Sequence, residues 1–521
     1  MKKLRIGVIL SDVEVPVWVA RMLERIRDAS HAKMIVLAFI GNNSNTQEAL
    51  AHRLSELHLQ LDKAVFRPDP DPLELRDVRT VLPNIPLLQA EPSKWNFLLK
   101  FADLDIFINL SQDRLPESLL HAARYGIWSL RGNDKRITTS TGRGWLELPK
   151  DGSLIDCAVE AQRGEAVQVV GRSVMAANRY SITHNQKSFL WRAASLLPYT
   201  IKQLYLNGET KFFADAESVE SAMRASKPGT GEIVDLALKQ FVGKLQNKVA
   251  KRGSQDNWIL MAGTRSSEEP LSWDKLKPIV PPTGVFWADP FIVHKESKTY
   301  IFFEEFLHKT GLGHISYVEI QQDGSIGKSQ AVLEKPYHLS YPFIFEYRGE
   351  FYMIPETAQQ RAIDMYRCTR FPDEWVYYKT IMQDLRAVDA TLIEHNGIWW
   401  MFVNIAGEGG STWDELHLFY ANDPLGDEWT PHPLNPVVSD VRYARPAGHI
   451  FSRDGKLIRP SQDSSLRYGY ALNLNRITVL TTTEYEEELL ERLEPPDDGD
   501  ILAVHTHNFS GNLTVVDAML K

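Results

Sequence analysis

The sequence predicts a multidomain protein with an N-terminal α/β domain, built on a doubly wound parallel sheet, and a C-terminal all-β propeller of five blades. In the first part of the chain, continuous apolar runs alternate with segments of helical periodicity. In the second half, one pattern recurs: an apolar strand, a short polar or glycine turn, and a second apolar strand. The expected boundaries are 1–207 for the α/β domain, 208–255 for a linker with a helix, and 256–521 for the propeller.

Strands and helices alternate along the first domain. The apolar runs 4–10 and 34–40 are typical of strands buried on both faces of a parallel sheet, and residues 17–27 between them have helical spacing. Two more strands are expected over 105–110 and 126–130, with a helix over 115–124. The turn after the first strand lacks the glycines of a dinucleotide fingerprint, so no nicotinamide cofactor is expected.

The segment 189–206 is basic, aromatic and amphipathic, and Pro198 is expected to break it. We expect a helix that packs on the first domain, and the alternative is a peripheral membrane contact through this segment. Residues 208–231 are polar and predict a loop-rich linker, and 233–249 has helical periodicity with basic residues at its end.

The repeated pattern defines equivalent positions in the five blades. These are Asp289, Tyr341, Asp389, Arg445 and His505, at intervals of 52, 48, 56 and 60 residues. A repeat of roughly 40–50 residues that carries several strands is typical of a propeller. A propeller gathers one position from every blade at a central funnel, so these side chains are expected to converge.

Composition and charge limit the classes of function. A net charge of −9 and a pI near 6.0 argue against nucleic acid as the main partner. Two cysteines without metal-type spacing suggest a reducing compartment. No run of 18 apolar residues predicts a transmembrane helix, and the N-terminal apolar stretch fits a buried strand better than a signal peptide. The expected location is the cytoplasm.

The candidate site collects charged and aromatic residues from one rim of an otherwise apolar repeat. The start of the first strand and the end of the second strand of a hairpin lie at the same end, so both contribute to the funnel. The catalytic candidates are Asp289, Asp389 and Arg445. The substrate-binding candidates are Trp287, Glu304, Glu305, Tyr341, Glu356, Asn404, Arg459, Asp463, Arg467 and His507, with His505 as the alternative to His507. No metal is predicted, because the two histidines do not have metal-type spacing.

The segment from Asp103 to Leu130 resembles the core of the formyltransferase fold. Tyr125 and Gly126 match that family's motif, but Ser129 and Arg131 stand where the family has its catalytic Asn and His. The resemblance therefore implies the fold with a binding or scaffolding role, since no imidazole is present to handle a proton. Sugar N-formylation by this domain is the alternative, and it predicts folate binding near Ser129.

The propeller resembles two further groups. Asp289 and Asp389 match the first two acidic residues of five-bladed arabinanase/xylosidase and invertase/levansucrase glycosidases, but Arg445 stands where their general acid is expected. The strings from Arg445 to Tyr470 and from His505 to Phe509 are similar to bacterial proteins that join a formyltransferase-like domain to a propeller. That propeller is in turn similar to the N-terminal domain of plant glucosamine inositolphosphorylceramide transferases.

Three functions follow from these patterns. The leading prediction is a glycosyltransferase that uses a nucleotide sugar in cytoplasmic assembly of a surface polysaccharide or glycolipid. In it Asp289 is the nucleophile or base, Asp389 orients the sugar, and Arg445 stabilises the leaving phosphate. The runner-up is an intracellular glycoside hydrolase with Glu356 or Asp463 as the acid. The third is a non-catalytic glycan-binding scaffold, which is favoured if Asp289 and Asp389 bind backbone amides of the blades. No cofactor is predicted.

Overall fold

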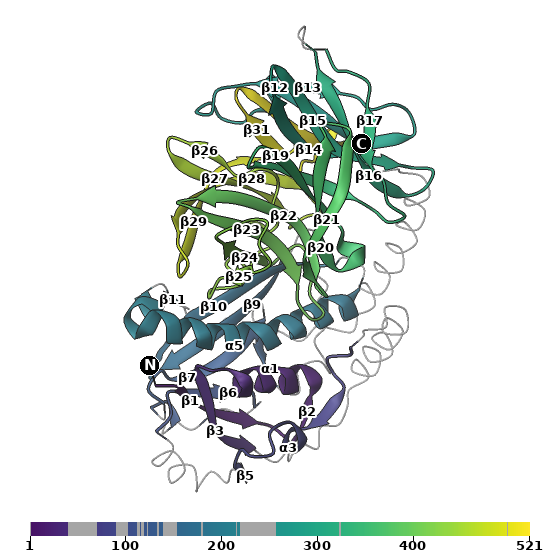
Figure 1. Cartoon of the computed structure of the whole chain (residues 1–521). Helices are drawn as coiled ribbons and strands as arrows, with labels where there is room; N and C mark the ends of the chain where they lie inside the picture. The colour runs from purple at the N-terminus through teal and green to yellow at the C-terminus, as the bar shows by residue number, and fades with distance from the viewer. Residues whose placement is uncertain are drawn as a thin grey trace. The chain divides into compact units, whose positions relative to one another are not determined.

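The computed structural model describes residues 2–39, 70–89, 103–111, 115, 119–121, 123–132, 135–138, 154–178, 181–214, 216–218, 257–321, 325–497 and 499–521 (Figure 1). The chain divides into two compact units, the second of which begins at Val249. The predicted helix over 233–249 lies outside the described residues, as do residues 116–118 and 122 of the one predicted over 115–124.

The N-terminal unit is built on a mixed sheet. Its strand order is β11-β10-β9-β7-β6-β1-β3-β5, with β8 beside β7. The parallel strands are β1 (Leu4–Leu10), β3 (Ala32–Phe39), β5 (Leu87–Gln89), β6 (Ile106–Asn109) and β7 (Ile127–Gly132). The antiparallel strands are β8 (Lys135–Ile137), β9 (Leu154–Arg163), β10 (Ala166–Ala176) and β11 (Glu217–Ser218). A separate pair joins β2 (Glu14–Pro16) and β4 (Leu75–Asp77). The predicted parallel strands are present, and the antiparallel half was not predicted.

Both faces of the parallel strands are buried. Ile6, Val8 and Leu10 of β1 lie in one core cluster with helices α1 (Val17–Asp28) and α5 (Ile182–Ala214), while Ile9 lies in a second cluster with Leu119. The remaining helix here is the single turn α3 (Val78–Val81). Because α1 and α5 contact each other, the described residues do not show the helices on both faces that a doubly wound sheet requires.

Helix α5 corrects the prediction for 189–206. The helix continues through Pro198, and its one non-helical residue is Gly208, whose φ of 73° suits glycine. Phe189, Leu190 and Trp191 are buried in the core of the N-terminal unit. Most apolar side chains of the segment are thus buried, as the predicted packing on the first domain requires, while Leu206 is exposed. A peripheral membrane contact through this segment stays a prediction. None of the helices in the described residues is long and apolar enough to cross a membrane.

The second unit is a propeller of five sheets. Blade 1 holds β14 (Val285–Lys295), β15 (Lys298–Leu307), β16 (Leu312–Ile320) and β17 (Gln330–Leu333). Blade 2 holds β18 (Ser340–Tyr347), β19 (Glu350–Glu356), β20 (Ala362–Arg370) and β21 (Glu374–Gln383). Blade 3 holds β22 (Arg386–His395), β23 (Ile398–Ala406), β24 (Leu416–Ala421) and β25 (Thr430–Pro431). Blade 4 holds β26 (Phe451–Arg453), β27 (Lys456–Asp463), β28 (Ala471–Leu480) and β29 (Tyr485–Leu493).

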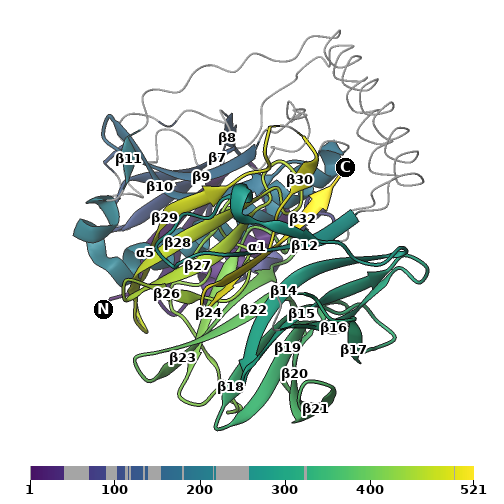
Figure 2. The same ribbon diagram turned by 90° about the horizontal axis from the view of Figure 1, so that it is seen from above.

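Blade 5 joins the two ends of the propeller. Strand β12 (Asn257–Thr264), the first of the unit, pairs antiparallel with β32 (Leu513–Leu520), the last (Figure 2). The other strands of this sheet are β13 (Lys277–Ile279), β30 (Ile501–Ala503) and β31 (His507–Ser510). The pairing of β12 with β32 closes the ring of blades. The fifth sheet therefore combines strands from both ends of the propeller, whereas each of the other blades is built from consecutive strands.

The first strands of the blades meet at the central axis. Strand β14 contacts β18, β31 and β32, and β18 contacts β22. Each of these first strands carries a β-bulge at the same place, between Ala288 and Phe291 in β14, between Ser340 and Phe343 in β18, and between Val388 and Thr391 in β22. The predicted equivalence of the first three blades is confirmed at the level of the backbone.

Candidate functional site

The three bulges fix the candidate residues of blades 1 to 3. Asp289, Tyr341 and Asp389 are the first bulged residues, and all three have positive φ, of 52°, 45° and 56°. This conformation is uncommon outside glycine and costs about 1–2 kcal/mol for each residue. Backbone strain persists only where surrounding contacts hold it, and it is often found at functional sites. Its recurrence at one end of the channel is therefore a reason to look for function there.

Five carboxyl groups gather at this end of the channel, and we call them the acidic cluster. They are Asp289, Glu304, Asp389 and Asp517, which are buried, and Glu356, which is partly buried. The charges of Asp289 and Asp389 act on the two glutamates of the set. Arg445 and His505 are the cations that contact the cluster.

Asp289 and Asp517 connect three blades through hydrogen bonds. The backbone N–H of Asp289 donates to Asp517 Oδ2 at 3.0 Å, and the backbone N–H of Tyr341 donates to Asp289 Oδ2 at 3.1 Å. Thr506 Oγ1 donates to Asp289 Oδ1 at 2.7 Å. The Asp517 carboxylate also accepts the backbone N–H groups of His505 and Thr506, both at 2.9 Å. Asp289 therefore has a structural role between blades whatever else it does.

Asp389 forms a different kind of contact. Arg445 donates through Nε to Asp389 Oδ2 at 2.5 Å and through Nη2 to Glu356 Oε2 at 3.4 Å. Gln462 Nε2 donates to the same aspartate oxygen at 3.4 Å. A guanidinium shared by two carboxyl groups favours the charged form of at least one of them. Asp389 is thus bound to side chains and not to blade-edge amides.

The protonation states within the cluster differ. Burial raises the pKa of Asp289 to about 6, a shift that His505 partly opposes. Burial and neighbouring carboxylates raise the pKa of Glu304 and that of Glu356 well above the usual range, which favours the protonated form of each. Burial alone would lower the pKa of His505, but Asp517 and Asp289 outweigh it and raise that pKa. The shift favours the protonated form of Glu356, whose side chain is hydrogen-bonded to Asp389, the partner of Arg445.

Aromatic residues cover the cluster. The Tyr468 ring lies 4.9 Å from the Arg445 guanidinium and 5.2 Å from the His505 ring. Trp413 lies 5.8 Å from Tyr468. The cavity beside Glu356 and Asp389 has a volume of only about 10 Å³. A sugar ring does not fit this cavity, so neighbouring side chains would have to move before it could reach the carboxyl groups.

Two predicted substrate-binding residues of blade 1 lie inside the blade. Trp287 donates through Nε1 to Glu305 at 3.0 Å, and its ring packs on Phe303. Burial by itself would raise the pKa of Glu305, but hydrogen bonds from His314, Trp287 and Ser316 hold it at about 2. Glu304, and not Glu305, belongs to the acidic cluster, because neighbouring strand residues point to opposite faces.

The other predicted residues fall into three groups. Arg459 is bonded to Glu487, and Asp463 to Arg492, so both are ion-paired within blade 4. His507 is bonded to Thr514 within blade 5, which places His505 and not His507 at the cluster. Asn404 is buried and bonded to the Thr412 carbonyl, and Arg467 is exposed on a loop.

Sequence reasoning missed Asp517 and Tyr468, and of the neighbours Gln462 and Asp463 it selected Asp463. Asp517 is the last residue of the fifth repeat copy, but it lies on the closing strand β32, whose partner β12 is distant in sequence. Gln462 and Asp463 are neighbours, and only the register shows that Gln462 faces Asp389. Tyr468 lies in a loop, for which the repeat gives no position.

One group of side chains has the composition of a metal site. Single ligand atoms of Asp289, His505 and Asp517 lie within 4.8 Å of one another. However, His505 Nδ1 lies 2.5 Å from Asp517 Oδ2, and the Asp517 oxygens already accept backbone N–H groups. The donors therefore satisfy each other, which does not fit a metal-ligand set that needs its lone pairs free.

Comparison with known proteins gives relatives for the propeller. Residues 279–497 match the family described as glucosamine inositolphosphorylceramide transferase 1, N-terminal. The proteins named glucosamine inositolphosphorylceramide transferase 1 from Oryza sativa subsp. japonica and Arabidopsis thaliana are each 35% identical over 206 residues. That match covers 39% of this chain and 27% of each relative, so the chain spans about a quarter of their length.

Solved structures with a similar propeller are glycosidases. The β-xylosidase RS223 has a TM-score of 0.34 and 13% identity, over 44% of this chain and 90% of that one. An exo-β-1,3-galactanase from Clostridium thermocellum has a TM-score of 0.32 and 11% identity, over 48% of this chain and 65% of that one. In sequence, the propeller of this chain is similar to the family described as glucosamine inositolphosphorylceramide transferase 1, N-terminal.

Proposed function

We propose that this chain is a carbohydrate-active protein and that its acidic cluster transfers a glycosyl group from an activated sugar to an acceptor hydroxyl. The observation that carries the proposal is the bond between Arg445 and the Asp389 carboxyl group, close to Asp289, at the strained end of the channel. The relatives named as transferases match this propeller, which supports the same reaction class. Their activity is a proposal here, because the match covers about a quarter of their length.

In the proposed reaction Asp289 is the base. Its pKa of about 6 leaves it mostly ionised near pH 7, so it can accept the proton of the attacking hydroxyl. The acceptor oxygen forms a bond to the anomeric carbon as the bond from that carbon to the phosphate oxygen breaks. The nucleoside diphosphate leaves with the bonding electron pair, and Arg445 stabilises its charge while Asp389 orients the guanidinium.

A glycoside hydrolase is the second candidate, and the state of Glu356 favours it. A hydrolase needs a carboxylic acid that is protonated at working pH, and burial beside Asp389 gives Glu356 such a raised pKa. Asp463, the other acid considered, is paired with Arg492 at 2.7 Å and is not suited to the role.

A glycan-binding scaffold is the third candidate, and the bonds of Asp289 favour it. This carboxylate accepts the backbone N–H of Tyr341 in the next blade, as a purely structural residue would. Asp389 does not share this property, since its partners are Arg445 and Gln462.

For the N-terminal unit, a formyltransferase-like fold without formyl-transfer activity remains our proposal. The parallel strands β1, β3, β6 and β7 support it. Arg131, which stands where that family has a histidine, pairs with Glu160 at 3.0 Å, and an ion-paired arginine cannot act as a base. Assembly of a surface polysaccharide or glycolipid in the cytoplasm also remains a prediction.

The test is turnover of a panel of nucleotide sugars by the purified full chain, with and without cell-envelope glycan acceptors, followed by mass spectrometry. We expect release of nucleotide or a glycosylated product, with losses on the order of 100-fold or more in Asp289→Asn and Asp389→Asn. Asp463→Asn is the matched control, because it changes a buried, ion-paired aspartate of the same propeller outside the cluster.

The outcomes separate the three candidates. Turnover that survives in both cluster variants would contradict a site at the acidic cluster. If the folded wild type releases nothing from the panel but cleaves glycosides with a dependence on Glu356, it is a hydrolase. If it binds a glycan without turnover, it is a scaffold.

A further inference from the structure

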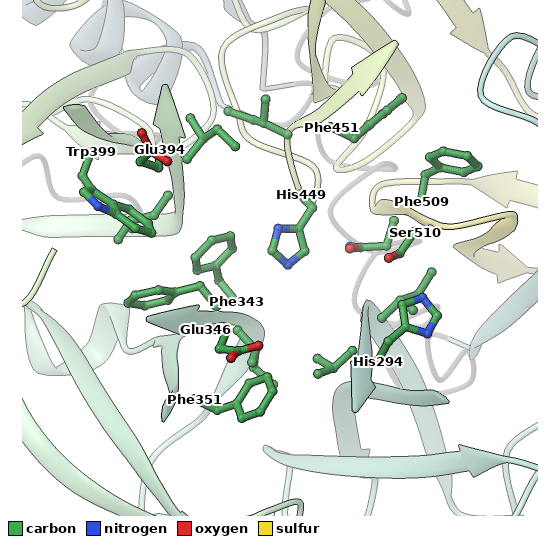
Figure 3. Close-up of a pocket in the computed structure, with 18 residues that line it drawn as sticks. His294, Phe343, Glu346, Phe351, Glu394, Trp399, His449, Phe451, Phe509 and Ser510 are labelled. Carbon is green, nitrogen blue, oxygen red and sulfur yellow. The ribbon is translucent and has the colours of Figure 1, made fainter. Parts of the chain in front are cut away.

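A cavity of about 500 Å³ opens at the end of the channel opposite to the acidic cluster (Figure 3). Its walls come from all five blades, from β14, β18, β22, β26 and β31 or the residues next to them, a few positions further along than the cluster, together with Phe351 of β19 and Trp399 of β23. In β14, for example, Asp289 belongs to the cluster and His294 to the cavity. Five residues of strand span about 16 Å, so the two places are distinct.

A layer of rings separates the cavity from the acidic cluster. The centroid of Phe291 lies 4.9 Å from Tyr341 and 5.3 Å from His449, and His449 lies 4.7 Å from Phe343. Tyr341 also accepts the backbone N–H of Gly448 at 2.7 Å. In Figure 3 the His449 ring points into the middle of the cavity, between Phe343 on one side and Ser510 on the other.

Blades 2 and 3 present the same pair of side chains to this cavity. Glu346 is the cross-strand partner of Phe351, and Glu394 is the cross-strand partner of Trp399. Both carboxylates lie five residues after the bulged position of their blade and are exposed. The backbone N–H of Gly397 donates to Glu394 at 2.9 Å and so helps to hold this carboxylate beside its ring partner. A carboxylate beside an aromatic face, repeated on neighbouring blades, is not needed to hold a hairpin together.

The lining has the charge of a cation site. Among the described residues that line the cavity there is no lysine and no arginine, while two are glutamates and six carry phenyl or indole rings. Burial lowers the pKa of His449 to about 4, so its ring is neutral near pH 7. The faces of aromatic rings carry negative potential and attract cations. The Phe351 ring already attracts a cation, because the ammonium of Lys295, which lies outside the lining, is 5.6 Å from the centroid of this ring.

We propose that this cavity is a second binding site and that it takes a small organic cation, an ammonium group carried on a ring or chain with an apolar face. The ammonium lies between Glu346 and Glu394, and the apolar face packs on Trp399 and Phe351. The volume suits a ligand of one or two rings. An amino sugar and a choline-type head group share this chemistry. The site does not depend on any activity at the acidic cluster.

The test is titration of the full chain with glucosamine, glucose and choline chloride at constant ionic strength, followed by calorimetry or saturation-transfer NMR. Glucosamine and glucose have the same ring and differ at one position in the ammonium group. We expect at least one ammonium ligand to bind at least about tenfold more tightly than glucose. Tighter binding of glucosamine than of choline indicates an amino sugar, and the reverse order indicates a choline-type ligand.

Two variants test whether the ammonium ligand binds in this cavity. The double change Glu346→Gln and Glu394→Gln is expected to weaken the ammonium ligand about tenfold or more, because two exposed charge pairs are lost. Glu374→Gln, at an exposed glutamate outside the lining, is the control and should leave binding unchanged. Equal affinity for glucose and glucosamine without choline binding, unchanged binding in the double variant, or no saturable binding of either ammonium ligand would each overturn the proposal.

Discussion

Asp517 shows how a single carboxylate can set the geometry of the whole cluster. Its two oxygens accept the backbone N–H groups of Asp289, His505 and Thr506, and one of them lies 2.5 Å from His505 Nδ1. Because Asp517 is fully buried, these donors have no water to replace it. Its position therefore determines where the strained backbone of Asp289 places the Asp289 side chain.

Asp517→Ala is expected to destabilise the propeller by about 4 kcal/mol. The change leaves three buried backbone N–H groups unpaired, and each unpaired group costs roughly 1–3 kcal/mol before the site relaxes. Chemical denaturation followed by circular dichroism measures the effect. The control is Asp274→Ala on an exposed turn, expected within about 0.5 kcal/mol of the wild type. Similar losses in both variants would show that Asp517 has no special role.

Asp289 gives a prediction for the pH dependence of the proposed reaction. A base must be ionised, and burial raises the pKa of this carboxyl to about 6. We expect kcat/KM to rise with pH through an apparent pKa near 6, a value that belongs to the coupled cluster. Asp289→Asn is expected to remove this limb together with most of the activity. A profile that is flat from pH 5 to 7 would contradict the role of base.

Glu305 gives a prediction for stability in acid. Its pKa is about 2 in the folded state against a model-compound value of 4.5, so its contribution is present above pH 4.5 and is lost as the pH falls towards 2. The difference corresponds to about 3 kcal/mol. Glu305→Gln is expected to destabilise the protein at neutral pH and to reduce the loss of stability on acidification, measured by urea denaturation between pH 7 and 3. An unchanged acid dependence would show that another carboxylate dominates.

Some residues of the cluster could be predicted, and the pattern of errors has one physical cause. Asp289, Tyr341 and Asp389 recur at the same place in each blade and were identified by spacing. The pairs Glu304 and Glu305, Gln462 and Asp463 could not be separated, because strand neighbours point to opposite faces and a bulge shifts the phase. The sequence shows the hairpin but not which of two adjacent side chains points inward.

At the scale of elements, the bulged first strands are the repeated unit of this propeller. Blade 4 departs from it, because Arg445-Pro446-Ala447-Gly448 replaces the bulged strand and Gly448 takes the positive φ, of 122°. A β-carbon at Gly448 would lie 2.0 Å from the carbonyl oxygen of His507 in blade 5. This glycine therefore permits the close contact between the last two blades.

Gly448→Ala is expected to destabilise the protein by about 3 kcal/mol or more, because both the backbone angle and the contact with the His507 carbonyl are unfavourable. The matched control is Gly455→Ala, at a hairpin turn where φ is also positive, 69°, but no atom lies within 4 Å of the added carbon. Gly455→Ala is expected to lower the free energy of unfolding by about 1 kcal/mol. Thermal unfolding measures both. Equal costs would mean that the contact between blades 4 and 5 adds nothing.

At the scale of the whole molecule, closure of the propeller was not predictable from the repeat. Five copies of a hairpin indicate five blades, but the pairing of β12 with β32 joins residues more than 240 positions apart, and no local pattern specifies it. The antiparallel strands β9 and β10 of the N-terminal sheet were missed for a similar reason, since the strand-helix alternation ends before them.

Removal of Leu513–Lys521 is expected to unfold the propeller cooperatively. The deletion removes β32, to which β12, β30 and β31 all pair, and it removes Asp517 from the cluster. We expect loss of the propeller's thermal transition or aggregation on expression. A truncated protein that melts at the same temperature as the full chain would show that closure contributes little to stability.

The central claim is that a sugar binds and reacts at the acidic cluster. The most direct test is the crystal structure of the protein soaked with a nucleotide sugar or a glycan fragment. We expect density for the sugar against Asp289 and Glu356, with the phosphate near Arg445 and the Tyr468 ring displaced. Density only at other places on the molecule, with Tyr468 still over Arg445 in crystals that have taken up the ligand, would contradict it.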